Sequence, residues 1–267
     1  MALRPAIMWM GKLYPPVWHG EELTPAELFG NLRGMGVEGI DIFARAAEQY
    51  GSDTLAEALK ESGLTCSCYY IAADLVADEP EKVQTADEAF ARGIEVARQL
   101  GTGICFTHGS QHAHAGEDNY RRYLDRLRDK LQLFKGTGLT LVIENAGPLL
   151  HTADRMVQAC QELGEDGLRL CPDTGNFTLW GQNEIDAVRR CLPWTVHFHI
   201  KDYAEHWMKE GRPGGREAVL GEGETPVEQI IDILKDAGWS GWLAWEPGPQ
   251  DEEGVAASVR ELLRLIG

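Results

Sequence analysis

Short apolar runs alternate with longer amphipathic segments along the whole chain, and this alternation constrains the fold more than any other feature of the sequence. A short apolar run is typical of a buried strand, and an amphipathic segment is typical of a helix that covers a sheet. A strand-like run followed by a helix-like segment occurs eight times. We place the strands at residues 6–10, 38–43, 65–71, 103–107, 139–144, 168–173, 195–201 and 241–246.

The segments between these runs carry residues that begin helices. Thr24 is followed by Pro at the first helical position and by Glu27 at the third, which is typical of a capped helix start. Thr225, Pro226 and Glu228 repeat this pattern late in the chain. These signals support a regular series of strand and helix pairs.

Such a series suits either a closed barrel or an open doubly wound sheet. An open sheet that binds a dinucleotide carries G-x-G-x-x-G after its first strand, and the segment MGKLYPP at 10–16 lacks it. The chain has 267 residues, a length that one parallel barrel commonly reaches. We therefore predict a single domain, residues 1–267, folded as a (β/α)₈ TIM barrel.

The chain has 42 acidic and 25 basic residues, a formal net charge of −17. A surface field of this sign repels nucleic-acid phosphates and anionic lipid headgroups. No run approaches the ~20 apolar residues that a membrane span needs, and the N-terminal apolar run is too short for a signal peptide. We expect a cytoplasmic protein with neither a nucleic-acid partner nor a membrane partner.

Six cysteines, at positions 66, 68, 105, 160, 171 and 191, form neither a C-x-x-C pair nor a cluster with the spacing of a zinc site. Side chains of a regular strand alternate between its two faces, so Cys66 and Cys68 are expected to share one face. We interpret them as small apolar strand residues, with a redox pair as the alternative.

The last four predicted strands end in side chains that bind metal ions. Glu144, Asp173 and Glu246 close their strands, and His199 lies near the end of its strand. The carboxyl ends of all strands of a parallel barrel meet at one rim, so the four side chains should converge there. Three carboxylates and one imidazole suit one divalent ion, Mn²⁺ first, then Mg²⁺ or Co²⁺, with Zn²⁺ as a further candidate.

The alternation within the strands supports this convergence. Thr140, Val142 and Glu144 share one face of their strand, whereas Leu141 and Ile143 face the helices. A single carboxylate at a strand end is as often a loop cap or a surface charge. Three carboxylates in one cavity repel one another, and burying them without a cation is costly.

Further polar side chains lie at or near the same rim. Asn145 and Asn176 follow two of the expected ligands, and their amides can donate and accept, which suits a hydroxylated ligand. Arg212 lies in a Gly- and Pro-rich loop at 210–217 that can reach over the barrel mouth. Loop caps, core contacts and local ion pairs are the alternatives. The candidate substrate-binding residues are His108, Asn145, Asn176, His197, Lys201 and Arg212.

In their order and spacing, these segments resemble the xylose isomerase-like superfamily, the metal-dependent barrels that include sugar isomerases, epimerases and endonuclease IV. The resemblance covers nearly the whole chain. It implies a metal ion held by Glu144, Asp173, His199 and Glu246, of which the two glutamates also move protons in the epimerase branch. The motifs that carry it are IEN at 143–145, DTGN at 173–176, HFHIKD at 197–202, LGEG at 220–223 and WE at 245–246.

The resemblance implies an isomerase or epimerase of a sugar, keto-sugar or cyclitol that works through an enediolate. The partner is then a small polyhydroxylated carbonyl compound, and the relatives imply self-association as a homodimer or homotetramer. Many members carry His three residues after the Asp of the sixth strand, where this chain has Asn176. The alternative is therefore a metal-dependent dehydratase or lyase acting on a keto-cyclitol or a dehydroshikimate-like compound.

Two further functions remain as alternatives. An endonuclease-like phosphodiesterase fits poorly, because the strand at 65–71 has no histidine for a multi-metal cluster and the net charge is −17. A non-catalytic barrel that binds a ligand or serves as one subunit of a complex is the other remote alternative, because one barrel hosts many functions.

Overall fold

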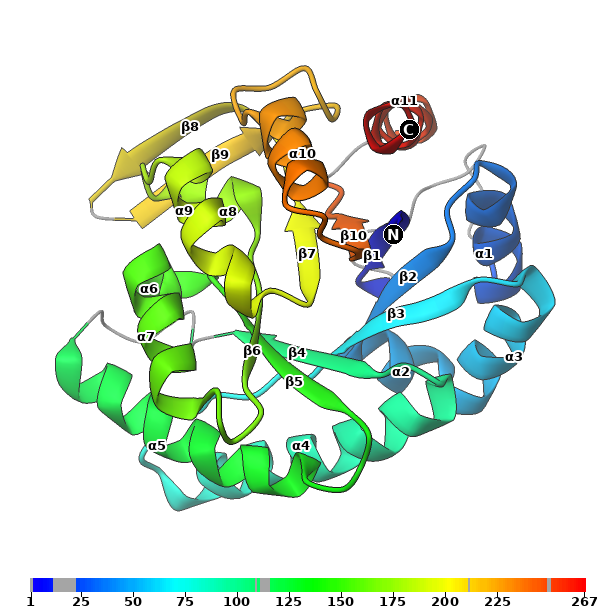
Figure 1. Ribbon diagram of the computed structural model, residues 1–267. Helices are drawn as coiled ribbons and strands as arrows, with labels where there is room; N and C mark the ends of the chain where they lie inside the picture. The colour runs from blue at the N-terminus through cyan, green and yellow to red at the C-terminus, as the bar shows by residue number, and fades with distance from the viewer. Residues whose placement is uncertain (1, 12–22, 109, 111–115, 211, 249–250) are drawn as a thin grey trace.

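Eight parallel strands form the wall of the molecule (Figure 1). The computed structural model describes residues 2–11, 23–108, 110, 116–210, 212–248 and 251–267. The strands are β1 (Leu3–Trp9), β2 (Gly39–Phe43), β3 (Thr65–Tyr70), β4 (Ile104–His108), β5 (Thr140–Glu144), β6 (Arg169–Cys171), β7 (His197–Ile200) and β10 (Gly241–Trp245). Each overlaps one predicted run.

The sheet has the strand order β6-β5-β4-β3-β2-β1-β10-β7. Two isolated bridges, Leu170 to Thr195 and Asp173 to His199, join the segments that contain its outermost strands, β6 and β7. The eight-stranded sheet is therefore nearly closed, and the prediction of a TIM barrel is confirmed.

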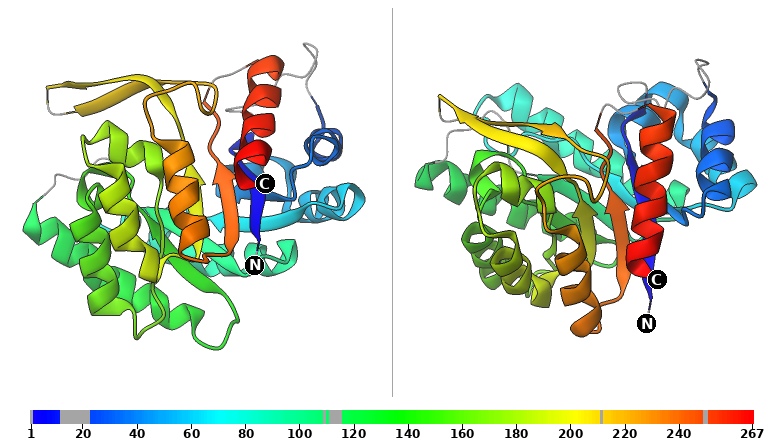
Figure 2. Two further views of the ribbon diagram at one scale, coloured as in Figure 1. Left: turned by 45° about the horizontal axis from the view of Figure 1, so that its top comes forward. Right: turned by 90° about the horizontal axis from the view of Figure 1, so that it is seen from above.

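Helices cover the outside of this wall, and α11 packs beside β1 so that the two ends of the chain meet (Figure 2). None of the helices in the described ranges is long and apolar enough to cross a membrane. The helices are α1 (Pro25–Gly34), α2 (Ala44–Tyr50), α3 (Ser52–Ser62), α4 (Pro80–Leu100), α5 (Glu117–Phe134), α6 (Gly147–Leu150), α7 (Ala153–Leu163), α8 (Thr174–Leu179), α9 (Glu184–Cys191), α10 (Val227–Asp236) and α11 (Glu252–Ile266).

The two predicted helix caps have different outcomes. At α1, the Thr24 hydroxyl accepts from the backbone N–H of Glu27, and the Glu27 carboxylate accepts from the Thr24 N–H, so this capping box is confirmed. The cap predicted at Thr225 is wrong, because α10 starts without a side-chain cap. Thr225 instead donates its N–H to Asp202, and its hydroxyl pairs with that of Thr178.

Apolar side chains form two separate layers. Val142 and Ala244 belong to a cluster inside the barrel, whereas Leu141, Ile143 and Leu243 belong to the larger cluster between the strands and the helices. This arrangement confirms the predicted inward and outward alternation on β5 and β10. The inner cluster consists of Ala6, Met8, Cys68, Tyr70, Phe106, Val142, Cys171, Trp242 and Ala244.

A bulge interrupts the alternation on β3 and corrects one prediction. Ile40 of β2 pairs with Cys66, and the next residue, Asp41, pairs with Cys68, so Ser67 is an extra residue in β3. Cys66 therefore lies in the outer layer and Cys68 in the inner layer, and the two do not share a face. A bulge lets two successive side chains point to the same side. Here the Ser67 hydroxyl reaches the carboxylate of Asp41.

The segment predicted as a loop around Arg212 is a strand. β8 (Tyr203–Lys209) and β9 (Arg212–Glu217) form an antiparallel hairpin that contacts α8 (Figure 1). Gly214 and Gly215 permit it, since a Cβ atom there would lie 2.6 Å and 2.5 Å from the rings of Trp207 and Tyr203. Arg212 pairs with Lys209 through its backbone, and its side chain lies outside the described part of the structure.

Candidate metal centre

The four side chains predicted to bind a metal ion come together at the rim. Glu144 ends β5, Asp173 follows β6, His199 lies in β7 and Glu246 follows β10. Each offers one ligand atom, and these atoms all lie within 4.8 Å of one another. Around the barrel the strands follow in the order β5, β6, β7, β10, so Glu144 and Glu246 approach from the two ends of this run.

The imidazole of His199 lies between two carboxylates. Its Nδ1 atom is 2.5 Å from Oε1 of Glu144, and its Nε2 atom is 3.1 Å from Oδ2 of Asp41. Burial disfavours the charged ring, but Cys171 and the hydrogen bonds to Asp41 and Glu144 outweigh burial and raise the pKa of His199. Without a cation the ring therefore keeps a proton that a metal ion would displace.

Asp173 has one oxygen in use and one without a partner. Oδ1 accepts the backbone N–H of Asn176 at 2.7 Å and so caps α8. Oδ2 is buried and has no hydrogen-bond partner among the described residues. Burial raises the pKa of Asp173 to about 8, an effect that Lys201 opposes and that the carboxylates of Glu246 and Glu144 reinforce. This is the electrostatic state that a bound cation would relieve.

Glu246 forms an ion pair with Lys201, one of the predicted substrate-binding residues. Lys201 is only 7% exposed. Burial lowers the pKa of Lys201, but attraction by Glu246 and other neighbours outweighs burial and raises it, so the ammonium stays charged. A Cβ atom on Gly175 would lie 2.8 Å from that of Lys201, so a glycine lets α8 approach this ion pair closely. Lys201 thus offsets part of the negative charge at the rim.

The two predicted asparagines play different parts. Asn145 is fully buried, and its side chain donates to the carbonyl of Asp173 at 2.9 Å and accepts the N–H of Asp173 at 2.6 Å. This pair of bonds fixes the end of β5 to the second residue after β6, so Asn145 positions Glu144 and Asp173 rather than facing the mouth of the barrel. Asn176 lies in the first turn of α8 and is partly exposed.

His108, predicted to bind substrate, ends β4 beside a residue that sequence reasoning missed. The Tyr70 hydroxyl and Nε2 of His108 are 2.5 Å apart, and the two rings are stacked. Burial, together with the nearby charge of Glu144, raises the pKa of Tyr70, so its phenol stays neutral. His108 is partly exposed at the rim and faces the Glu144 side of the candidate centre.

A buried polar network lies one layer below the rim, and its central residue was not predicted. Asp41 accepts hydrogen bonds from Ser67 at 2.5 Å and from His197 at 2.7 Å, in addition to the contact with His199. Burial opposes the charge of Asp41, but the attraction of His197 and the histidine hydrogen bonds hold the pKa of Asp41 below its usual value. Cys171, His197 and His199 form a second group of potential ligand atoms at this depth.

His197, predicted to bind substrate, is fully buried in this network, which agrees with the alternative of a core contact. Asp41 had one signal in the sequence, namely a charged residue in the middle of the apolar run EGIDIF. A charge at the centre of a buried strand needs partners.

Glu217, at the end of β9, is a second missed residue. Burial raises the pKa of Glu217, attraction by Lys201 opposes this, and repulsion by Glu246 adds to it, so its carboxylate lies near that ion pair. Gly248, after β10, has no side chain where the Glu217 carboxylate lies. The sequence carries no signal for Glu217, because its position depends on the hairpin.

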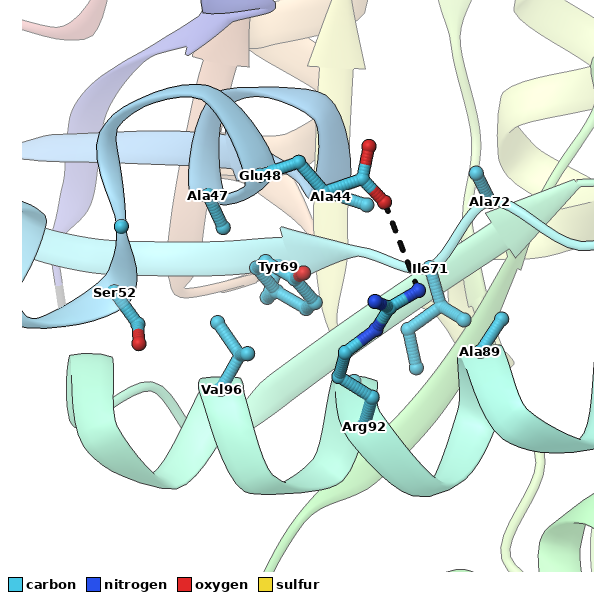
Figure 3. A pocket seen from close by; sticks show the side chains of 12 residues that line it. Ala44, Ala47, Glu48, Ser52, Tyr69, Ile71, Ala72, Ala89, Arg92 and Val96 are labelled. Carbon is cyan, nitrogen blue, oxygen red and sulfur yellow. Dashed lines mark ion pairs between the residues drawn. The ribbon is translucent and has the colours of Figure 1, made fainter.

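A separate pocket of about 260 Å³ lies outside the barrel, between α2, β3 and α4 (Figure 3). Arg92 points from α4 toward Glu48 of α2, and the two form an ion pair at 3.7 Å across walls of alanine and glycine. Both side chains are more than half exposed. None of the four clustered ligand residues lines this pocket, so the pocket is separate from the candidate metal centre at the rim.

Comparisons with known proteins agree with this fold. The chain is 24% identical over 176 residues to L-ribulose-5-phosphate 3-epimerase UlaE of Escherichia coli O157:H7, a match that covers 64% of this chain and 59% of that relative. Apo 3-keto-D-glucoside 4-epimerase YcjR from E. coli superposes with a TM-score of 0.78 at 15% identity, covering 98% of each chain.

The probable 3-DHS dehydratase AsbF from Bacillus anthracis superposes with a TM-score of 0.76 at 16% identity, covering 98% of this chain and 99% of that one. At this identity the two superpositions show a shared fold. The family model described as "Xylose isomerase-like TIM barrel" matches residues 29–266. The chain therefore belongs to the xylose isomerase-like TIM-barrel family.

Proposed function

We propose that this chain is a divalent-metal-dependent isomerase or epimerase that acts on a sugar, keto-sugar or cyclitol through an enediolate. The observation that carries the proposal is the group of Glu144, Asp173, His199 and Glu246, whose ligand atoms lie within 4.8 Å of one another at the rim. Family membership and the epimerase name of the relative UlaE support the same class of reaction.

The residues of this group fit a divalent cation. Oδ2 of Asp173 is buried without a hydrogen-bond partner among the described residues, and burial, reinforced by the nearby carboxylates, raises the pKa of Asp173. A cation would give that oxygen a partner and offset the repulsion. Three carboxylates and one imidazole suit Mn²⁺ best, then Mg²⁺, Co²⁺ or Zn²⁺. When bound, the ion would polarise a substrate carbonyl and stabilise the charge of an enediolate.

Glu144 and Glu246 are the groups that we assign to proton transfer. Burial raises the pKa of Glu144, but the hydrogen bond and charge of His199 outweigh burial and lower it, so Glu144 is ionised and can accept a proton. Glu246 is held by Lys201 at the other end of the strand run. One carboxylate would remove the proton from the carbon beside the carbonyl, and the other would return a proton to the opposite face.

Contacts with the substrate are assigned to the residues that remain at the rim. His108 and Asn176 are partly exposed there, and Lys201 can donate to an oxygen beside Glu246. Asn145 and His197 are fully buried and are assigned to positioning. A hydroxylated carbonyl compound suits these donors and acceptors.

The test combines metal analysis with a deuterium-exchange screen. Purified protein dialysed against Mn²⁺ should retain about one ion per chain, and in D₂O it should exchange a carbon-bound proton of at least one keto-sugar or inosose. Protein treated with a chelator is the matched control and should exchange nothing. Protein that retains no divalent ion and exchanges no proton would overturn the proposal.

A dehydratase on a keto-cyclitol or dehydroshikimate-like compound is the second candidate. Asn176 stands three residues after Asp173, where the epimerase resemblance implies a histidine, and this difference favours it. Proton abstraction is common to both reactions, but only the dehydratase loses water. A new enone absorbance during turnover would therefore select the dehydratase, and exchange without that absorbance would select the epimerase.

A further inference from the structure

Among the residues that the structure describes, Asp41 is the one carboxylate of the polar network below the rim, and it contacts the ligand candidate His199 from beneath. It comes from β2, on the far side of the barrel from the strands that supply the ligands. Its two oxygens accept three hydrogen bonds: Oδ1 from Ser67, and Oδ2 from both histidines. Asp41 has no exposed surface, so solvent does not compete for these bonds.

The two nitrogens of His199 face different parts of the molecule. Nε2 faces Asp41 at 3.1 Å, and Nδ1 faces Glu144 and the candidate centre at 2.5 Å. A carboxylate cannot donate, so the bond to Asp41 requires the proton on Nε2 of His199. The lone pair of Nδ1 is then the one available to a metal ion, and rotating the ring would break one of the three hydrogen bonds of Asp41.

We propose that Asp41 is a positioning residue that fixes the ring of His199 with Nδ1 directed at the metal ion. This inference rests on the proposed function, because it requires a divalent ion at the rim.

The bulge in β3 holds Asp41 itself. Ser67 is the extra residue of that bulge, and its hydroxyl donates to Oδ1 of Asp41 at 2.5 Å. His197 donates to Oδ2 at 2.7 Å from the strand that also carries His199. Since Nδ1 of His197 has no hydrogen-bond partner among the described residues, the proton of this ring belongs on Nε2, facing Asp41. Asp41 is therefore held on both oxygens before any ion binds.

The experiment measures Mn²⁺ affinity by calorimetry, and by electron paramagnetic resonance of the free ion, at one pH. Asp41→Asn keeps the shape of the side chain but removes its charge and one acceptor. We expect the dissociation constant for Mn²⁺ to rise about 10–100-fold, the usual cost of losing such a partner of a ligating histidine. The melting temperature of the metal-free variant is recorded in parallel.

Thr107→Val is the matched control, because Thr107 is a fully buried hydroxyl that bonds to the carbonyl of Ile71 instead. It should lower the melting temperature but leave Mn²⁺ affinity within about twofold of the original chain, since it touches no ligand. Ser67→Ala tests the same inference more gently and should weaken Mn²⁺ binding about two- to tenfold. If Asp41→Asn does not fold, Ser67→Ala decides.

The outcomes separate the two proposals. If the original chain binds Mn²⁺ and Asp41→Asn binds it within twofold as tightly, the role of Asp41 is refuted while the metal centre stands. The same conclusion follows if only Ser67→Ala folds and its affinity is unchanged. An original chain that binds no Mn²⁺, Mg²⁺, Co²⁺ or Zn²⁺ refutes the metal centre and this inference together.

Discussion

Two fully buried aspartates of the same barrel interior are in opposite electrostatic states. Asp41, in the lower layer, has hydrogen-bond donors on both oxygens and a lowered pKa. Asp173, at the rim, has one oxygen without a partner among the described residues and a pKa raised to about 8. The carboxylate of Asp41 is satisfied by the protein alone, whereas the carboxylate of Asp173 is not. An incompletely satisfied carboxylate at the rim above a satisfied one is the expected arrangement where a ligand completes the site.

The largest effect is expected from removing the proton acceptor at the rim. Glu144→Gln keeps the size of the side chain but cannot take a proton, so substrate proton exchange should fall about 10²–10⁴-fold. The rate is measured by NMR in D₂O with the substrate found in the screen. Glu205→Gln is the control, since Glu205 pairs with Arg216 on the exposed hairpin and should leave the rate unchanged. Full exchange in Glu144→Gln would remove this residue from proton transfer.

The next largest effect concerns the satisfied carboxylate of Asp41. Asp41→Ala leaves three donors, on Ser67, His197 and His199, without their acceptor. We expect the metal-free protein to lose about 3–5 kcal/mol of stability, the usual cost of breaking a buried polar pair from one side. Chemical denaturation with chelator present gives this value. A loss under about 1 kcal/mol would mean that water replaces the carboxylate.

Asp173→Asn should change the stability of the metal-free protein in the opposite direction and by a smaller amount. Above the folded pKa of about 8 it removes a buried charge that lacks a partner, so at pH 9 the metal-free protein should gain about 1–2 kcal/mol. The same change should abolish Mn²⁺ binding, because an amide is a weaker ligand than a carboxylate. Denaturation curves with and without Mn²⁺ report both properties. A metal-free variant that is less stable than the original chain would show that Asp173 is satisfied after all.

A pH dependence also separates metal-free from metal-bound protein. The folded pKa of Asp173, about 8, lies above its unfolded value of about 4. Between these values the folded state binds the extra proton, so stability of the metal-free protein should fall as pH rises from 4 to 8. The raised pKa of His199 acts in the same direction, because its stabilisation is lost as pH rises through the folded pKa.

A bound ion requires both groups to lose their protons. The rise in melting temperature on adding Mn²⁺ should therefore grow from pH 5 to pH 8 and level off above. Scanning calorimetry at four pH values measures it. A rise of equal size at every pH would mean that neither Asp173 nor His199 releases a proton to the ion.

The fold and the four candidate ligands were predictable because they depend on local pattern. Glu144 and Glu246 end their apolar runs, and the alternation along a strand decides which side chains face inward. Parallel strands in a barrel then bring their ends together regardless of the details of the loops. The alternation along each strand and the place of each residue at a strand end were therefore enough to predict these features.

The residues that were missed depend on the pairing of distant segments. Asp41 meets His197 across 156 positions, and only the register of the closed barrel brings them together. Glu217 reaches the rim through a hairpin that the glycines at 214 and 215 made to look like a loop. Asn145 was predicted to contact substrate, but whether its amide faces ligand or backbone is decided by the position of Asp173.

β3 contains one residue more than the distance it spans requires. Excising the codon for Ser67 would leave Cys66 paired with Ile40 and Cys68 with Asp41, in an unbroken ladder, and Tyr69 and Tyr70 would keep their present sides. The shortened protein would thus retain its wall and lose the hydroxyl next to Asp41, together with the carbonyl that accepts from Thr102. Since the sheet does not require this extra residue, we attribute the bulge to the hydroxyl that Ser67 places against Asp41.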